Sequence, residues 1–191
     1  MLIGITGGIG SGKSVVSRIL RTMGYHVYDT DARAKQLMEE SEAVRRQLVA
    51  AFGEQSFVDG KLNREYLSAR VFSSEEERRR MNAIVHPAVR KDLEQWVASR
   101  REEISFVESA LLLGSELQEV VDAIWLVTAP IEVRIARVME RNQCTREEVL
   151  QRINSQASDA EMRPFCTAEL DNGEEQSLLR QLFQLLKKGI Q

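Results

Sequence analysis

The sequence is poor in the residues that mark several classes of protein. Among 191 residues it has two cysteines, three prolines and two histidines. Neither Cys144 nor Cys166 forms a C-x-x-C pair, so a disulfide framework is excluded and we expect free thiols in a reducing, cytoplasmic setting. No run approaches the roughly 20 apolar residues needed to cross a bilayer, and no basic segment precedes the apolar start. We therefore expect no membrane partner and no signal peptide.

The sequence also lacks a strong excess of either charge. It has 26 basic and 29 acidic residues, for a formal net charge of -3. Such a chain has no global field that draws polyanions, so we expect no nucleic acid among its partners. Any nucleotide must be held by local geometry, in a defined pocket. The 43% hydrophobic and 29% charged composition is that of a soluble globular protein.

The apolar pattern predicts an α/β fold with a parallel sheet and a helical insertion. Leu2–Thr6 is expected to form a buried strand, residues 13–23 a helix and residues 25–28 a second strand. Strand, helix, strand is the unit that builds parallel sheets. Residues 32–101 are expected to be mostly helical, with a break at Val58–Lys61. The other expected elements are strands at 104–107, 123–127 and 168–170, and helices near 133–139, 147–153 and 177–188.

The turn after the first strand carries a complete phosphate-binding motif. Residues 7–14, GGIGSGKS, match G-x-x-x-x-G-K-[ST] between a strand and a helix, as the motif requires. The glycines let successive N–H groups surround a phosphate, and the helix adds its positive end. Lys13 supplies a charge for the β- and γ-phosphates, and Ser14 offers a hydroxyl to Mg²⁺. The predicted ATP-binding residues here are Gly8, Ile9, Gly10, Ser11, Gly12, Lys13, Ser14 and Val15.

The motif alone leaves the reaction open, because P-loop proteins include kinases, motors, switches and ATPases. The guanine-reading motif Asn-Lys-x-Asp is absent, since residues 170–173, LDNG, lack the lysine. The chain is also shorter than most motor ATPases. A small-molecule kinase is the best class, with a nucleoside monophosphate or a sugar acid as possible acceptors. A nucleotide-binding regulatory module without transferase activity is the alternative from another class.

Acidic residues follow two of the expected strands. Asp29 and Asp31 stand at the carboxyl end of the second strand, where ligands bind in open parallel sheets. A carboxylate there can accept the proton of an attacking hydroxyl, although aspartates are also favoured helix caps. Glu108 follows the strand at 104–107, where P-loop enzymes place an acidic residue that holds Mg²⁺. An ordinary surface carboxylate is the alternative for Glu108.

Arginines recur on one face of an expected helix. Arg134, Arg137 and Arg141 are spaced i, i+3 and i+7, and Arg146 follows. Such a face closes over phosphates and stabilises the charge of the transition state, or it is a solvated basic surface. The residues alone favour neither. His86 is a further candidate base, with a hydrogen-bonded structural histidine as the alternative.

Together these motifs resemble the dephospho-CoA kinase family. The resemblance extends over about residues 2–185, and the insertion contributes its most specific part. The similar segments are ITGGIGSGKS at 5–14, DTDARA at 29–34, DGKLNR at 59–64, NAIVHP at 82–87, RVMER at 137–141, RINSQ at 152–156 and DNG at 171–173.

The resemblance implies a P-loop three-layer fold and a specific reaction. The nucleotide-binding core is expected at 1–31 and 102–191, a helical CoA-binding subdomain at 32–101 and a lid at 137–160. The implied reaction is phosphorylation of the ribose 3′-hydroxyl of dephospho-CoA by ATP with Mg²⁺, the last step of coenzyme A synthesis. The implied residues are Asp31, Lys13, Arg137 and Arg141 for catalysis, Asn172 for ATP, Asp31, Arg64 and His86 for substrate, and Ser14 and Glu108 for the metal.

Three positions depart from the family pattern. Gly114 ends a segment, ALLLG, that lacks the family's proline and glutamate. Met162 stands where a lysine is common, next to Arg163, and Cys166-Thr167 replace an Ala-Asp pair. These departures affect the lid and the adenine pocket and leave the phosphate loop intact.

Overall fold

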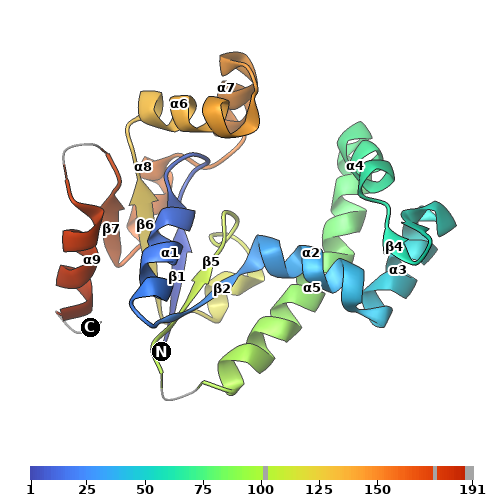
Figure 1. Ribbon diagram of the computed structural model, residues 1–191, viewed down its shortest axis with the longest axis horizontal. Coiled ribbons are helices and arrows are strands. Elements are labelled where there is room, and N and C mark those ends of the chain that lie inside the picture. Colours follow the sequence, from blue (N-terminus) through green and yellow to red (C-terminus); the bar gives the residue numbers. More distant parts are fainter. Residues whose placement is uncertain (101–102, 174–175, 188–191) are drawn as a thin grey trace. The chain divides into compact units, whose positions relative to one another are not determined.

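A five-stranded sheet organises the first of two compact units in the computed structural model, which describes residues 1–100, 103–173 and 176–187 (Figure 1). This unit comprises residues 1–28 and 100–191, and the second comprises residues 29–99. Residues 101, 102 and 188, at the ends of predicted segments, lie outside the described residues. The strands are β1 (Leu2–Thr6), β2 (His26–Asp29), β5 (Ser105–Glu108), β6 (Ala123–Thr128) and β7 (Ala168–Asp171).

The strands follow the order β2-β5-β1-β6-β7, with β1 at the centre. β1 pairs in parallel with β5 and β6, and β6 pairs in parallel with β7. Every residue of β1 is buried, as a strand covered on both faces requires. Ile5 lies beside Glu108 on one neighbouring strand and beside Trp125 on the other. The carboxyl ends of β1 and β5 therefore meet at one edge, where the phosphate loop begins.

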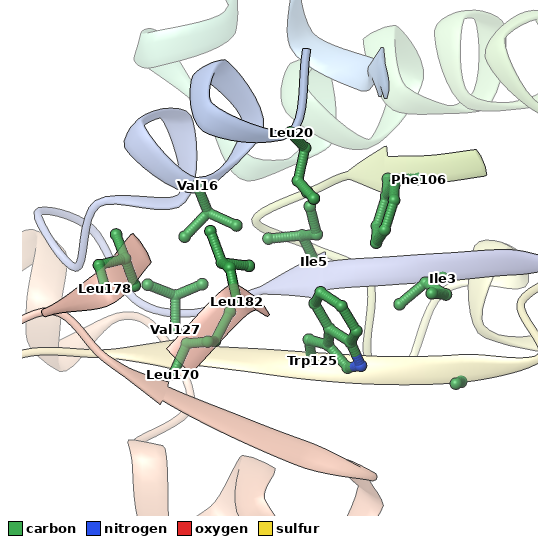
Figure 2. Close-up of a cluster of buried hydrophobic side chains, with 11 residues drawn as sticks. Ile3, Ile5, Val16, Leu20, Phe106, Trp125, Val127, Leu170, Leu178 and Leu182 are labelled. Atoms are coloured by element: carbon green, nitrogen blue, oxygen red, sulfur yellow. The ribbon is translucent and has the colours of Figure 1, made fainter. Parts of the chain in front are cut away.

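Helices and loops of the same unit cover this sheet. They are α1 (Lys13–Thr22), the 3-10 helix η2 (Glu116–Glu119), α6 (Ile131–Asn142), α7 (Arg146–Asn154), α8 (Asp159–Met162), the 3-10 helix η3 (Arg163–Phe165) and α9 (Leu178–Lys187). Figure 2 shows α1 packed over the sheet, with Val16 and Leu20 directed toward Ile5. The cluster consists of Ile3, Ile5, Val16, Leu20, Phe106, Ala123, Trp125, Val127, Leu170, Leu178 and Leu182.

Each large apolar side chain in this core contributes roughly 1.5–3 kcal/mol by leaving water. Phe106 contacts Trp125 at 5.3 Å between ring centroids and meets Tyr25 edge-on. On the opposite face of β1, a Cβ at Gly4 would overlap the side chain of Leu112. The loop after β5 therefore packs directly on the central strand β1. Packing of this core fixes where the carboxyl ends of β1 and β5 lie.

The second unit is mostly helical, as the composition of the insertion predicted. Its helices are α2 (Thr30–Glu40), α3 (Glu42–Phe52), the 3-10 helix η1 (Glu54–Ser56), α4 (Arg64–Ser73) and α5 (Glu75–Ala98). The predicted break is an antiparallel hairpin of β3 (Phe57–Val58) and β4 (Lys61–Leu62). Asp59 and Gly60 between them have φ values of 50° and 78°, the left-handed pair that a two-residue hairpin turn needs. A small core of Val44, Leu48, Phe52 and Leu67 holds the unit together.

Candidate active site

The phosphate loop is shaped so that side chains cannot replace its glycines. Gly10 and Gly12 have φ values of 78° and 99°, in the left-handed region that favours glycine. A Cβ on Gly12 would also overlap the Nδ2 atom of Asn172. The loop leads into α1, which begins at Lys13 and has no acidic residue in its first turn. The positive end of that helix is therefore open to an anion.

Lys13 bridges the loop through its ammonium group. Its Nζ donates hydrogen bonds to the carbonyl oxygens of Gly7 at 2.6 Å and Gly8 at 3.3 Å. Ser11 is buried, whereas Ser14 and Val15 are exposed. The ammonium group of Lys13, which is predicted to contact the phosphates, thus lies across the predicted phosphate-binding loop.

The three predicted arginines lie on one helix and have three different environments. Arg134 is buried, and its Nε donates to the carbonyl oxygen of Ile9 at 2.9 Å. Arg137 is half-buried; its Nη2 donates to the carbonyl oxygen of Asn172 at 3.0 Å, and within the described residues its buried Nη1 has no hydrogen-bond partner. Arg141 is exposed. Burial excludes a solvated basic face for Arg134, whereas Arg141 lies at the surface and its catalytic role stays a prediction.

Asn172 joins the end of β7 to the phosphate loop. Its Nδ2 donates to the carbonyl oxygen of Ser11 at 2.8 Å, across 161 residues of sequence. Its backbone N–H donates to Thr128 at the end of β6. Asn172, which was expected to contact ATP, is thereby held against the loop that was expected to bind the phosphates. Asn172 as an ATP contact stays a prediction.

The predicted metal ligands offer only oxygen atoms. Ser14 lies at the start of α1, and Glu108, half-buried, ends β5 at the same edge of the sheet. Among the described residues no three His, Cys, Asp or Glu side chains gather into a metal site. Mg²⁺ prefers oxygen ligands and is usually held by one or two protein groups, phosphate oxygens and water. A hydroxyl and a carboxylate fit that ion.

Asp29 and Asp31, two neighbouring aspartates of the second unit, have different environments. Asp29 is the N-cap of α2, and its Oδ1 accepts a hydrogen bond from the N–H of Ala32 at 2.9 Å. Asp31 lies in the first turn of the same helix and is exposed. The capping role that the sequence left open thus belongs to Asp29. The assignment of Asp31 as the base stays a prediction.

The other two predicted substrate residues are also exposed in this unit. Arg64 forms an ion pair with Glu39 at 2.7 Å, at the surface. His86 is exposed on α5, next to the proline inside that helix. Both residues stay predictions as substrate contacts.

Sequence reasoning missed two residues that contact the loop or its partner. The Oε1 atom of Gln156 accepts a hydrogen bond from the N–H of Ile9 at 2.8 Å, and Asp159 forms an ion pair with Arg134 at 3.4 Å. Gln156 stands in the segment RINSQ, but local sequence assigns it no partner 147 residues away. Asp159 carries no motif signal at all.

Comparison with known proteins assigns the family. A family model described as dephospho-CoA kinase matches residues 1–177. A dephospho-CoA kinase of Bacteroides fragilis is 39% identical over 186 residues, which is 96% of this chain and 90% of that protein. The chain belongs to the dephospho-CoA kinase family. A Thermus thermophilus crystal structure matches with a TM-score of 0.83 and 37% identity, covering 100% of this chain and 98% of that one.

A dephospho-CoA kinase from Campylobacter jejuni has the same fold, with a TM-score of 0.72 at 22% identity and coverage of 100% and 98%. The predicted α/β fold of a P-loop kinase is confirmed by the mostly parallel sheet and these matches. None of the described helices is both long and apolar enough to cross a bilayer.

The structure describes the surroundings of the residues that depart from the dephospho-CoA kinase pattern. Met162, in place of a lysine, is buried at 5% exposure. Cys166 donates to the carbonyl oxygen of Met162, and burial raises the pKa of the Cys166 thiol to about 11. That thiol therefore stays protonated at neutral pH. Gly114 has a φ of 73°, which only glycine adopts readily.

Proposed function

We propose that this chain transfers the γ-phosphoryl group of ATP to the 3′-hydroxyl of dephospho-CoA, giving coenzyme A and ADP. The observation that carries the proposal is the intact phosphate loop, with Lys13 across it, in a chain of this family. The implied substrates are ATP and dephospho-CoA. The free thiols of Cys144 and Cys166 support a cytoplasmic location.

The phosphate side of the reaction belongs to the first unit. The backbone N–H groups from Gly10 to Ser14 and the positive end of α1 hold the β- and γ-phosphates. Lys13 neutralises the charge on the oxygens between them. Arg137 has one donor bound to Asn172 and a second, Nη1, available for the transferred group. Arg141, exposed one turn later, would act on the same charge only when the lid is closed.

Ser14 and Glu108 would hold Mg²⁺ together with phosphate oxygens, and the ion would neutralise charge on the phosphates. The protein would contribute the Ser14 hydroxyl at the start of α1 and the Glu108 carboxylate at the end of β5. Both lie at the edge where the loop begins, so the ligands come from rigid elements.

The acceptor side belongs to the second unit. Asp31 takes the proton of the 3′-hydroxyl as its oxygen attacks the γ-phosphorus, while the bond from that phosphorus to the β-γ bridging oxygen breaks and ADP leaves. An exposed carboxylate is suited to this role, because it is not engaged in capping as Asp29 is. Arg64 and His86 are proposed to bind dephospho-CoA, and residues 29–99 are proposed as its binding unit.

The test is ADP release by the purified protein with MgATP and each of three acceptors: dephospho-CoA, AMP and gluconate. We expect rapid turnover with dephospho-CoA alone, and mass spectrometry should find coenzyme A as the product. Turnover with AMP or gluconate instead would replace the proposed acceptor by a nucleotide or a sugar acid. ATP binding without transfer to any of the three would replace the enzyme by a regulatory module.

A further inference from the structure

Arg134 is a buried charge whose side chain hydrogen-bonds to the phosphate loop at Ile9 and to Asp159. It is 7% exposed, on the first turn of α6. Its Nε donates to the carbonyl oxygen of Ile9 at 2.9 Å, and a Cβ on Gly8 would overlap its Nη2. A Cβ on Gly10 would come within 2.6 Å of its backbone oxygen. The arginine therefore packs directly against the loop, and the loop glycines allow that approach.

The peptide groups of Ile9 are held from both sides. The N–H donates to Gln156 at 2.8 Å, and the carbonyl oxygen accepts from Arg134 at 2.9 Å. Gln156 lies between α7 and α8, and Arg134 lies on α6. The side chain of Ile9 packs on the cluster of Ile135, Val138 and Val149 from α6 and α7. Segments 125 to 147 residues away in sequence therefore set the conformation of the loop's middle.

Asp159 completes the arrangement as the carboxylate partner of Arg134. The two charges are 3.4 Å apart, with side-chain exposures of 8% for Arg134 and 23% for Asp159. Burial raises the pKa of Asp159, while the charges of Arg134, Arg163 and Lys13 oppose the rise. A buried charge whose partner is removed is strongly unfavourable, so the two residues should act as a unit.

We propose that Arg134 and Asp159 are positioning residues that hold the phosphate loop in its nucleotide-binding shape through the carbonyl oxygen of Ile9. Neither residue needs to touch ATP. Arg134 keeps the Ile9 peptide from rotating, and Asp159 keeps the guanidinium in place. The next peptide groups, from Gly10 onward, then remain directed toward the phosphates. The inference rests on the proposed function only in taking ATP as the nucleotide.

Substitution at Asp159 separates positioning from simple electrostatics. Asp159 is close enough to Lys13 for the positive charge of the lysine to lower its pKa, against the effect of burial. If charge alone mattered, Asp159→Asn would strengthen the binding of a polyanion. Positioning predicts the opposite, because the neutral amide no longer anchors Arg134.

The experiment measures binding of a non-hydrolysable ATP analogue by calorimetry and the steady-state constants for both substrates. The analogue needs no acceptor, so this measurement is independent of whether dephospho-CoA is the substrate. We expect Arg134→Met to weaken analogue binding about tenfold, Arg134→Lys to recover part of that loss, and Asp159→Asn to weaken binding about threefold or more. KM for dephospho-CoA should not change.

The matched control is Arg79→Met, which removes an exposed arginine of α5 that is paired with Glu75 at 2.6 Å. It should leave analogue binding unchanged. If Arg134→Met does not fold, analogue binding by Arg134→Lys and Asp159→Asn tests the proposal instead. Unchanged or tighter analogue binding in folded Asp159→Asn would overturn the proposal. So would losses of equal size for both substrates that simply follow the melting temperature.

Discussion

The two units of this protein are built by different kinds of contact. In the first, side chains hold backbone groups more than 100 residues away, as Arg134 and Gln156 hold Ile9 and as Asn172 holds Ser11. In the second, many of the polar contacts are local or lie at the surface, such as the pair of Arg79 with Glu75 one turn away. Buried, fixed backbone donors suit the recognition of phosphate, whose geometry never varies. An exposed helical surface suits a large substrate that must enter and leave.

We propose that the first unit binds the nucleotide and the second binds the acceptor, and Lys13→Ala tests this division with the largest expected effect. We expect kcat to fall by about 10³-fold, because the charge on the β- and γ-phosphates loses its cation in a preorganised site. Binding of dephospho-CoA should persist. Lys187→Ala, which removes an exposed lysine on α9, is the control. Steady-state rates on folded protein give the answer, and near-normal turnover would refute the role of Lys13.

The second test concerns the acceptor side, with Asp31→Asn. The amide keeps the size of the side chain but cannot take the proton, so kcat should fall by at least about 10²-fold while affinity for dephospho-CoA changes little. Asp29→Asn is the control, because asparagine caps a helix about as well as aspartate does. Rates and binding are measured for both variants. A crippled Asp29→Asn beside a nearly normal Asp31→Asn would show that the base is misassigned.

The smallest effect, on the free energy of unfolding, is expected from the surface pair of Arg163 and Glu169 in the first unit. The forked hydrogen bond from Arg163 lowers the pKa of Glu169, opposed by partial burial and helped by Thr128. A lowered pKa contributes stability that is present above the unfolded value of about 4.5 and is lost as pH falls through the folded value. Since the pair is largely exposed, the contribution should be below about 1 kcal/mol.

Denaturant unfolding of Glu169→Gln and the unchanged protein at pH 7 and pH 3 measures this contribution. The difference in unfolding free energy should be small at pH 7 and smaller still at pH 3, because more of the Glu169 carboxylate is then protonated. A difference that grew toward acid would contradict the assignment of the pKa shift to Arg163. A large difference at pH 7 would also weaken the contrast between surface and interior contacts.

Local pattern was enough to locate the phosphate loop. The motif at residues 7–14 needed only a strand before it and a helix after it, and both are present. The hairpin at 57–62 replaced a predicted break, because Asp59 and Gly60 mark a turn without showing what flanks it. The sequence could not distinguish the environments of the three arginines of α6. Their i, i+3 and i+7 spacing places them on one helix face but does not show what packs against each turn of that face.

The sequence by itself determined the phosphate loop, the α/β alternation and the helical insertion, because glycine backbone freedom, hydrophobic period and helix propensity act between near neighbours. Only the tertiary structure decided that Arg134 is buried against Ile9, that Asp29 caps a helix while Asp31 is exposed, and that Gln156 and Asp159 support the loop. Burial and hydrogen bonding of a side chain depend on what the folded chain brings beside it. No residue carries that information in its own neighbourhood.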